Sequence, residues 1–199
     1  MMIRRPASAV EWARVFIRPA LKQGARAVDA TAGNGRDTLF MAANVGPRGH
    51  VYALDIQDEA LLNTKKRLAG AGLLERVSIF RRGHQDMDQL VKEQVDAVMF
   101  NLGYLPGSDR SVTTRPETTR EGIKAALNLL KPGGRLSVVV YTGHPGAGAE
   151  AEAVAGLLAG LSLTEFNVQK MVFWNSRVHS PELYFVTRTG EKNGEVEEA

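Results

Sequence analysis

Residues 28–38 read Val-Asp-Ala-Thr-Ala-Gly-Asn-Gly-Arg-Asp-Thr and join two different patterns. The segment Ala25–Ala30 predicts a first strand, and the pattern Asp37–Ala43 predicts a helix. Gly33 and Gly35 between them permit a tight turn, and the free N–H groups that open the helix suit a carboxylate ligand. A plain strand-to-helix turn without a ligand is the alternative. The third glycine of a Gly-x-Gly-x-x-Gly pattern, counted from Gly33, is absent, which argues against a pyrophosphate cofactor.

The alternation of strand and helix continues along the chain, which predicts a mostly parallel α/β sheet with helices on both faces. Two final β segments are too close together for a helical crossover, so we expect an antiparallel hairpin. This expected arrangement resembles the plan of Rossmann-like methyltransferases. The predicted strands are 25–30, 50–55, 77–81, 95–100, 135–142, 164–174 and 182–187, and the predicted helices are 8–22, 37–43, 59–69, 87–92, 117–130 and 149–158. Ser8 and Glu11 predict a capping box at the start of the first helix.

The composition is that of one folded domain, with 199 residues, 44% of them hydrophobic and 24% charged. We expect this domain to span residues 1–189 and the acidic segment 190–199 to be a disordered tail. The chain has no cysteine, which excludes disulfides and thiolate metal sites, and its four histidines stand apart at positions 50, 84, 144 and 179. We therefore expect no metal site. Without a run of about 18 apolar residues or an apolar N-terminal signal, a cytoplasmic protein without a membrane span is expected.

The charge is unevenly distributed. The net charge is +3, but residues 191–199 hold four glutamates and one lysine, so they carry −3 and the other 190 residues carry +6. Residues 1–26 alone carry +5. A basic body permits a nucleic-acid partner, and a solvated surface is the alternative.

Ligands of such sheets bind beyond the carboxyl ends of the strands. Asp55 ends the second predicted strand, where an acid can accept both ribose hydroxyls of NAD or S-adenosylmethionine. Ile56 and Gln57 follow it and are placed to contact an adenine. His84 and Gln85 follow the third strand and could contact the edge of the same ring. The alternatives are a helix cap for Asp55 and a solvent-exposed turn for His84.

The fourth predicted strand ends at Phe100, and a long polar loop, Asn101–Thr113, follows it. Such loops inside a compact domain are usually functional. Its polar and charged candidates, with the arginine just after it, are Asn101, Tyr104, Asp109, Arg110 and Arg115. Tyr141 lies at the end of the fifth predicted strand and His144 follows it, and either could contact a substrate.

Three stretches together resemble the MnmM/YtqB-like methyltransferases, a family formerly described as rRNA methylases. They are Asp29-Ala-Thr-Ala-Gly-Asn-Gly-x-Asp37-Thr38, Phe100-Asn-Leu-Gly-Tyr-Leu-Pro-Gly-x-Asp109 and Tyr141-x-Gly-His-Pro-Gly146. The resemblance covers about residues 28–146. It implies a class I S-adenosylmethionine-dependent fold with a seven-stranded sheet. It also implies methylation of the aminomethyl group of 5-aminomethyl-2-thiouridine at the tRNA wobble position, in the anticodon loop, by a homodimer.

The residues that we expect to bind S-adenosylmethionine are Asp29, Gly33, Asn34, Gly35, Asp37, Asp55, Ile56, Gln57, His84, Gln85 and Asn101. Those expected to bind the substrate are Leu102, Gly103, Tyr104, Arg110, Arg115, Tyr141 and His144. The catalytic candidates are Asn101, Tyr104 and Asp109.

The expected reaction is attack of a neutral amine on the methyl carbon of a sulfonium, accelerated mainly by alignment. Asn101, with the carbonyls of Leu102 and Gly103, would hold the amine N–H groups, and Tyr104 would stack on the base. The proton acceptor stays open among Asp109, Tyr141, His144 and water. Three arginines, Arg110, Arg115 and Arg120, would meet phosphates.

Three other functions remain possible from the sequence. The chain could methylate ribosomal RNA or a small amine, since the cofactor residues do not identify the acceptor. It could be an NAD-dependent oxidoreductase, which Asp55 alone permits. It could also be an RNA-binding module without catalytic activity.

Overall fold

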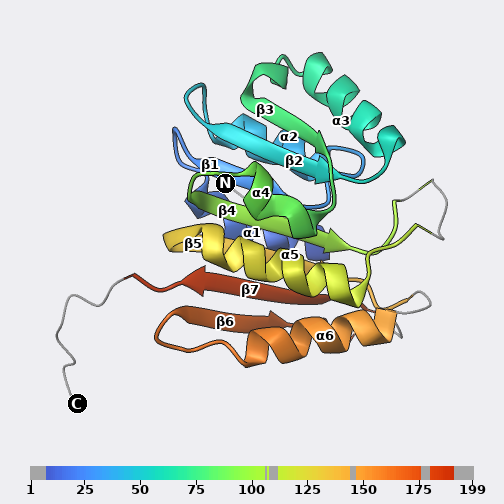
Figure 1. The fold of residues 1–199 in the computed structure, drawn as a ribbon, viewed down its shortest axis with the longest axis vertical. Coiled ribbons are helices and arrows are strands. Elements are labelled where there is room, and N and C mark those ends of the chain that lie inside the picture. Colours follow the sequence, from blue (N-terminus) through green and yellow to red (C-terminus); the bar gives the residue numbers. More distant parts are fainter. Residues whose placement is uncertain (1–7, 106, 108–111, 144–146, 176–179, 191–199) are drawn as a thin grey trace.

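The computed structural model describes residues 8–105, 107, 112–143, 147–175 and 180–190. Its centre is a seven-stranded sheet with the strand order β3-β2-β1-β4-β5-β7-β6 (Figure 1). Neighbouring strands from β3 to β5 pair in parallel, and β7 pairs antiparallel with β5 and β6. The strands are β1 (Arg26–Asp29), β2 (His50–Asp55), β3 (Val77–Arg81), β4 (Val95–Leu102), β5 (Leu130–Val140), β6 (Phe166–Met171) and β7 (Glu182–Arg188). The predicted fold class is confirmed.

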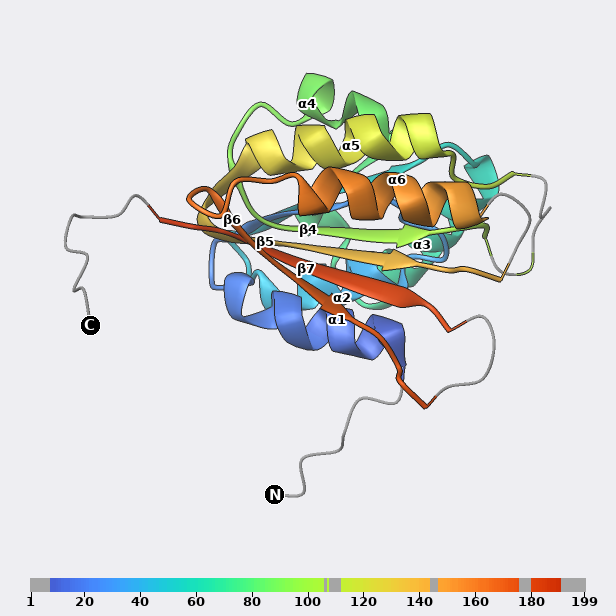
Figure 2. The ribbon, with the colours of Figure 1, turned by 90° about the horizontal axis from the view of Figure 1, so that it is seen from below.

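Helices cover both faces of the sheet (Figure 2). One face carries α1 (Ala9–Ile17), α2 (Arg36–Asn44) and α3 (Asp58–Gly70). The other carries α4 (Met87–Leu90), α5 (Pro116–Leu129) and α6 (Ala147–Ala159). Short 3-10 turns, η1 (Arg18–Ala20), η2 (Leu74–Arg76) and η3 (His84–Asp86), lie in the connections.

The first helix is shorter than the sequence predicts. Its capping box is confirmed, because Glu11 N–H donates to Ser8 Oγ at 3.2 Å and Ser8 N–H donates to the Glu11 carboxylate at 3.1 Å. The prediction that the helix runs to residue 22 is wrong: α1 ends at Ile17. Pro19 has no N–H to continue the hydrogen-bond ladder, so the chain tightens into η1.

Two central strands are longer than predicted. β4 runs on to Leu102, so Asn101 lies inside the strand rather than after it. β5 begins at Leu130, directly after α5, although the sequence predicts that this strand begins at residue 135. Leu130 pairs with Val95 of β4, and the register shifts before Ala97. Residues 131–134, which include Gly133 and Gly134, therefore form a bulged part at the start of β5.

Both faces of the sheet are buried, which explains the continuous apolar runs in its strands. Along β4, Phe100 packs toward the α4–α6 side, whereas Met99 packs toward the α1–α3 side. The helices pack against the sheet with fully buried side chains, such as Ile123 on the α4–α6 side and Ile17 on the α1–α3 side.

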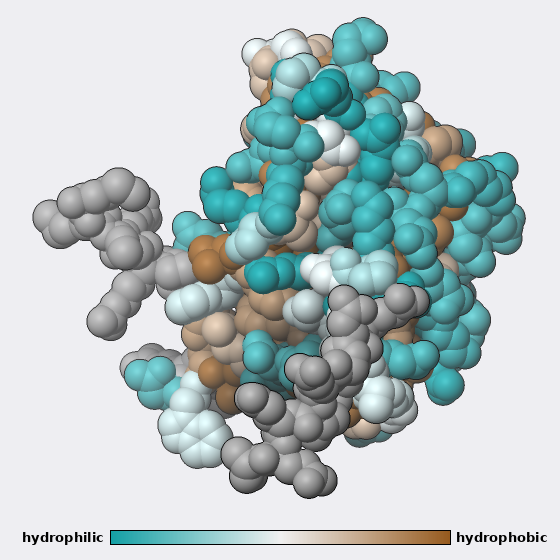
Figure 3. All heavy atoms as spheres, turned by 90° about the vertical axis from the view of Figure 1, so that its left-hand side faces the viewer, coloured by the Kyte–Doolittle hydropathy of each residue, from teal (hydrophilic) through white to brown (hydrophobic). Residues whose placement is uncertain are grey.

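The face at the amino ends of the parallel strands, on the left in Figure 1, is covered mainly by hydrophilic residues in its upper part (Figure 3). Charged side chains at this edge pair with one another. Arg26 pairs with Glu93 at 3.0 Å, and Lys131 pairs with Asp96 at 2.9 Å. The opposite edge, at the carboxyl ends, holds the cleft described below.

Two helical glycines offer a matched test of the packing between α5 and η3. A Cβ at Gly122 of α5 would lie 2.6 Å from Cδ2 of the buried His84 ring, whereas a Cβ at Gly156 of α6 would meet no atom within 4 Å. We expect Gly156→Ala to stabilise the protein by up to about 1 kcal/mol through helix propensity. We expect Gly122→Ala to destabilise it by about 1–3 kcal/mol through overpacking. Urea unfolding of both variants measures this, and equal stabilisation by both would contradict the packing.

Candidate active site

A cleft of about 1130 Å³ opens at the carboxyl ends of β1, β2, β4 and β5. The direction in which successive strands are added to the sheet reverses here. β2 and β3 lie on one side of β1, and β4 and β5 lie on the other side. The predicted site residues that line the cleft are Gly33, Asn34, Asp37, Asp55, Ile56, Gln57, His84, Gln85, Asn101, Leu102, Gly103, Tyr104, Arg115 and Tyr141. Asp29 and Gly35 do not line the cleft. Asp109, Arg110 and His144 lie outside the described residues.

The turn after β1 is braced by α3. Thr64 Oγ1 donates to the Gly33 carbonyl at 3.1 Å, and Arg67 Nε donates to the Asn34 carbonyl at 2.7 Å. Gly35 takes φ = +71°, and a Cβ there would lie 2.7 Å from the Cα of Thr64. A side chain is thus excluded at Gly35 both by the left-handed backbone and by the helix behind it.

Asp29 supports the turn from below. Its carboxylate accepts the Thr38 hydroxyl at 2.6 Å and the Thr31 N–H at 3.3 Å, and it has no exposed surface. Burial, helped by the negative charge of Asp37, raises the pKa of Asp29 to about 7. In this structure Asp29 therefore contacts the turn and the start of α2 and does not line the cleft.

Asp55 ties the end of β2 to the turn. Its carboxylate accepts the Gly33 N–H at 2.8 Å and the Gln57 N–H at 3.0 Å. Burial raises the pKa of Asp55, and these backbone hydrogen bonds oppose the rise. Asp55 is not the cap of α3, which begins at Asp58 with Gln57 in the capping position.

His84 is buried, so the alternative of a solvent-exposed turn is wrong. Its ring lies edge-on to Phe100, with centroids 5.5 Å apart. Burial lowers the pKa of His84 to about 4, and the ring is neutral at pH 7. Its Nε2 is buried and has no hydrogen-bond partner in the described part of the chain.

Asn101 connects β4 to the helical side of the cleft. Its N–H donates to Thr31 Oγ1 at 2.8 Å, and its side-chain amide donates to the Asp37 carboxylate. Asp37 also accepts from Arg14 Nε at 2.6 Å. Among the described groups, none bonds to Asn101 Oδ1, which is buried.

The segment that follows Asn101 is held by a buried acid from α6. Gly103 N–H donates to Thr114 Oγ1 at 2.9 Å, and the Gly103 carbonyl accepts the Thr114 N–H at 3.0 Å. The Thr114 hydroxyl donates to Glu150 at 2.8 Å, and Thr119 donates to the same carboxylate at 2.7 Å. This network fixes the backbone that leads to Tyr104.

Tyr141 follows β5 and is 40% exposed at the cleft. Burial of its hydroxyl and the negative charge of Asp37 raise the pKa of Tyr141 above its usual value. The phenol therefore keeps its proton at neutral pH, and it can donate a hydrogen bond but is a poor base.

Sequence reasoning missed the contribution of α1 to the cleft. Ser8, Glu11 and Arg14, from α1 and its capping residue, line the cleft. Arg36 of α2 and Arg82 after β3 also line it, and both are exposed. The basic character of residues 1–26 was a signal for this region. Periodicity alone could not indicate that Arg14 reaches a carboxylate on another helix.

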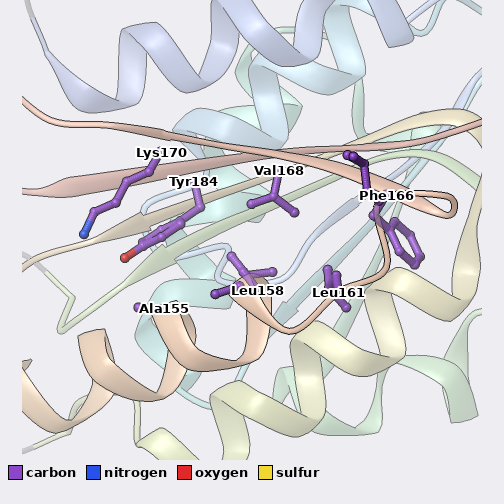
Figure 4. Close-up of a pocket in the computed structure, with 9 residues that line it drawn as sticks. Ala155, Leu158, Leu161, Phe166, Val168, Lys170 and Tyr184 are labelled. Atoms are coloured by element: carbon purple, nitrogen blue, oxygen red, sulfur yellow. The ribbon is translucent and has the colours of Figure 1, made fainter.

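A second cavity of about 370 Å³ lies between α6 and the β6–β7 hairpin (Figure 4). Leu158, Leu161 and Val168 face it, and its two lining residues with a polar end, Lys170 and Tyr184, both bond to Glu182. Lys170 pairs with Glu182 at 2.9 Å and lies over the Tyr184 ring. This cavity lies between packed elements, and none of the described residues that the sequence predicts for the site lines it.

Neither a metal site nor a membrane span is found in the part of the chain that the structure describes. No group of three or more histidine, aspartate or glutamate side chains there could hold a metal ion. No helix there combines the length and apolar character needed to cross a bilayer.

A family profile described as "Putative rRNA methylase" matches residues 51–187. The tRNA (mnm5s2U34)-methyltransferase of Arabidopsis thaliana chloroplasts is 40% identical over 188 residues, which span 89% of this chain and 68% of the plant protein. The chain belongs to this methyltransferase family.

Solved structures of the family agree with the fold. A "putative rRNA-methylase" from Clostridium thermocellum has 40% identity and a TM-score of 0.90, covering 94% of this chain and 100% of its own. A protein from Streptococcus mutans, in complex with S-adenosylhomocysteine, has 35% identity and a TM-score of 0.84 over 94% of this chain and 99% of its own. The protein is thus an S-adenosylmethionine-dependent methyltransferase with the class I fold.

Proposed function

We propose that this methyltransferase transfers a methyl group to the 5-aminomethyl group of 5-aminomethyl-2-thiouridine at the tRNA wobble position, giving 5-methylaminomethyl-2-thiouridine. The observation that carries the proposal is the carboxamide of Asn101. Its amide nitrogen is committed to Asp37, and its buried oxygen on the cleft wall has no partner in the described part of the chain. A primary amine supplies the N–H that such an oxygen requires. The name of the Arabidopsis relative supports the same substrate.

The described residues fit S-adenosylmethionine, which supplies a methyl group on a sulfonium that leaves as a neutral thioether. The Asp55 carboxylate would accept the ribose hydroxyls with the lone pairs that Gly33 and Gln57 leave free. Ile56 is 53% exposed in the cleft, which leaves its side chain open to an adenine ring. Neutral His84 and the neighbouring Gln85 would contact the edge of that ring.

The chain's main chemical task is to align the amine. Asn101 Oδ1 would accept one amine N–H and aim the nitrogen lone pair, and such alignment can supply about 7–11 kcal/mol of barrier reduction. Gly103 contributes less than expected, because its carbonyl already accepts the Thr114 N–H. Tyr104 would stack on the base. With Tyr141 held protonated, the proton acceptor is Asp109, His144 or water.

The substrate side of the cleft suits a polyanion. Arg36, Arg82 and Arg115 are exposed at the cleft, where their guanidinium groups would meet phosphates of the anticodon loop. We further propose that residues 1–189 act as one catalytic domain in the cytoplasm, assembled as a homodimer as the family resemblance implies.

Replacement of Asp55 tests the cofactor assignment. We expect Asp55→Ala to weaken the binding of S-adenosylhomocysteine at least tenfold, since charge-assisted hydrogen bonds are lost. Calorimetric titration measures the affinity. The control is Asp58→Ala at the start of α3, where the carboxylate is exposed and pairs with Arg81. Unchanged affinity in Asp55→Ala would exclude the ribose contact.

The substrate is tested on tRNA with and without the aminomethyl group. After incubation with enzyme and S-adenosylmethionine, mass spectrometry of the wobble nucleoside should show a gain of one methyl group in aminomethylated tRNA and none in tRNA that lacks it. Ribosomal RNA and a small primary amine are the parallel acceptors. Methylation of either of these, with the tRNA left unchanged, would reject the proposed substrate.

Trp174 is a further candidate contact for the anticodon loop. β6 runs in the same direction as β5, so its carboxyl end lies at the cleft edge of the sheet. Met171 pairs with Leu183, which pairs with Val139, two residues before Tyr141. Trp174 follows three residues later and is 92% exposed.

We expect Trp174→Ala to weaken tRNA binding about tenfold, because one base–aromatic stack contributes about 1–3 kcal/mol. Leu163→Ala is the matched control, since Leu163 is 74% exposed and precedes β6 at the opposite edge. Filter binding measures both variants, and equal affinities would rule out the contact.

A further inference from the structure

Three elements converge on one carboxylate beside the cleft. Asp37 lies in the first turn of α2 and is 7% exposed. One of its oxygens accepts from Arg14 Nε of α1 at 2.6 Å, and the other accepts from the amide of Asn101 in β4. Both oxygens therefore have a donor, and Arg14 supplies the compensating positive charge in a partly buried place.

This arrangement determines which way the Asn101 amide faces. An ionised carboxylate only accepts hydrogen bonds, so Asn101 must turn its NH₂ group toward Asp37. The flipped amide would set its oxygen against the carboxylate oxygen, and two acceptors repel each other. Oδ1 is consequently left without a partner in a buried position, at a cost that a bound N–H group would remove.

We propose that Asp37 and Arg14 are positioning residues that lock the Asn101 amide so that its oxygen receives the N–H of the methyl acceptor. This inference rests on the proposed function and refines it, since the sequence assigns Asp37 to cofactor binding. It also makes α1 part of the catalytic apparatus, because Arg14 is its contribution to the lock.

Asp37→Asn is the main test. An asparagine at this position can offer either an oxygen or an NH₂ group, so Asn101 loses its single favoured orientation. We expect kcat on aminomethylated tRNA to fall at least tenfold, with the affinity for S-adenosylhomocysteine unchanged within threefold. A loss that falls mainly on cofactor affinity would overturn the proposal in favour of direct cofactor binding.

Replacement of Arg14 is a second test, and it leaves the residues of the turn after β1 unchanged. Arg14→Ala should lower kcat, and Arg14→Lys should retain more activity because it keeps the charge. The control is Arg18→Ala, since both arginines lie over the Phe40 ring, at 5.5 and 5.1 Å, but Arg18 bonds to Asn44 rather than to Asp37. Equal loss in the two alanine variants would show that the effect is packing of α1.

A double-mutant cycle separates positioning from general structural support. If Asp37 acts through Asn101, then Asp37→Asn should have no further effect on kcat in an Asn101→Ala background. Losses that multiply would show that the two residues act independently and would overturn the proposal.

A readout without turnover keeps this inference distinct from the proposed substrate. In NMR spectra of side-chain amides, the Asn101 NH₂ group should show one proton shifted downfield by its bond to a carboxylate, assigned by its loss in Asn101→Ala. Asp37→Asn should move it upfield. If the tRNA is not methylated, the proposed function fails while this signal still reports the lock, and its absence from the wild-type spectrum would refute the lock itself.

Discussion

The parallel pairing of β1 with β2 on one side and β4 on the other is the constraint on which the site depends. It brings the carboxyl ends of three strands to one edge, and the chain reverses its direction of travel across the sheet there. The turn after β1 can then bond to Asp55 from β2 through the Gly33 N–H, while Thr31 bonds to Asn101 of β4. Both bonds depend on β1 lying between β2 and β4.

Three acids surround that turn, and the structure treats each one differently. Asp29 is buried under the turn with a raised pKa, where hydroxyl and backbone donors surround it. Asp37 faces a guanidinium group, and Asp55 faces two backbone N–H groups at the edge of the cleft. These environments fit the roles proposed above for the three acids: Asp29 supports the turn, Asp37 orients Asn101 and Asp55 binds the cofactor.

Much of the fold could be read from the sequence because buried parallel strands leave plain apolar runs. The ranges of β2 and β3 agree with the prediction residue for residue. Boundaries failed where tertiary pairing overrides local preference. Residues 131–134 contain turn formers, yet they lie within β5, because Leu130 and Arg135 on either side of them pair with Val95 and Ala97 of β4. Asn101 likewise belongs to β4 because the strand continues to pair with β5 as far as Leu102.

The sequence by itself determined the order of elements, the position of the glycine turn and the acid at the end of the second strand, because each depends on local periodicity and spacing. It also placed Asn101 at the site. Only the tertiary structure decided what each side chain does there, because hydrogen-bond partners come from distant segments. Arg14 and Asp37 are 23 residues apart, and Asp37 and Asn101 are 64 apart. No local pattern encodes a contact between one helix face and another, so the orientation of Asn101 became visible only once the three elements were packed together.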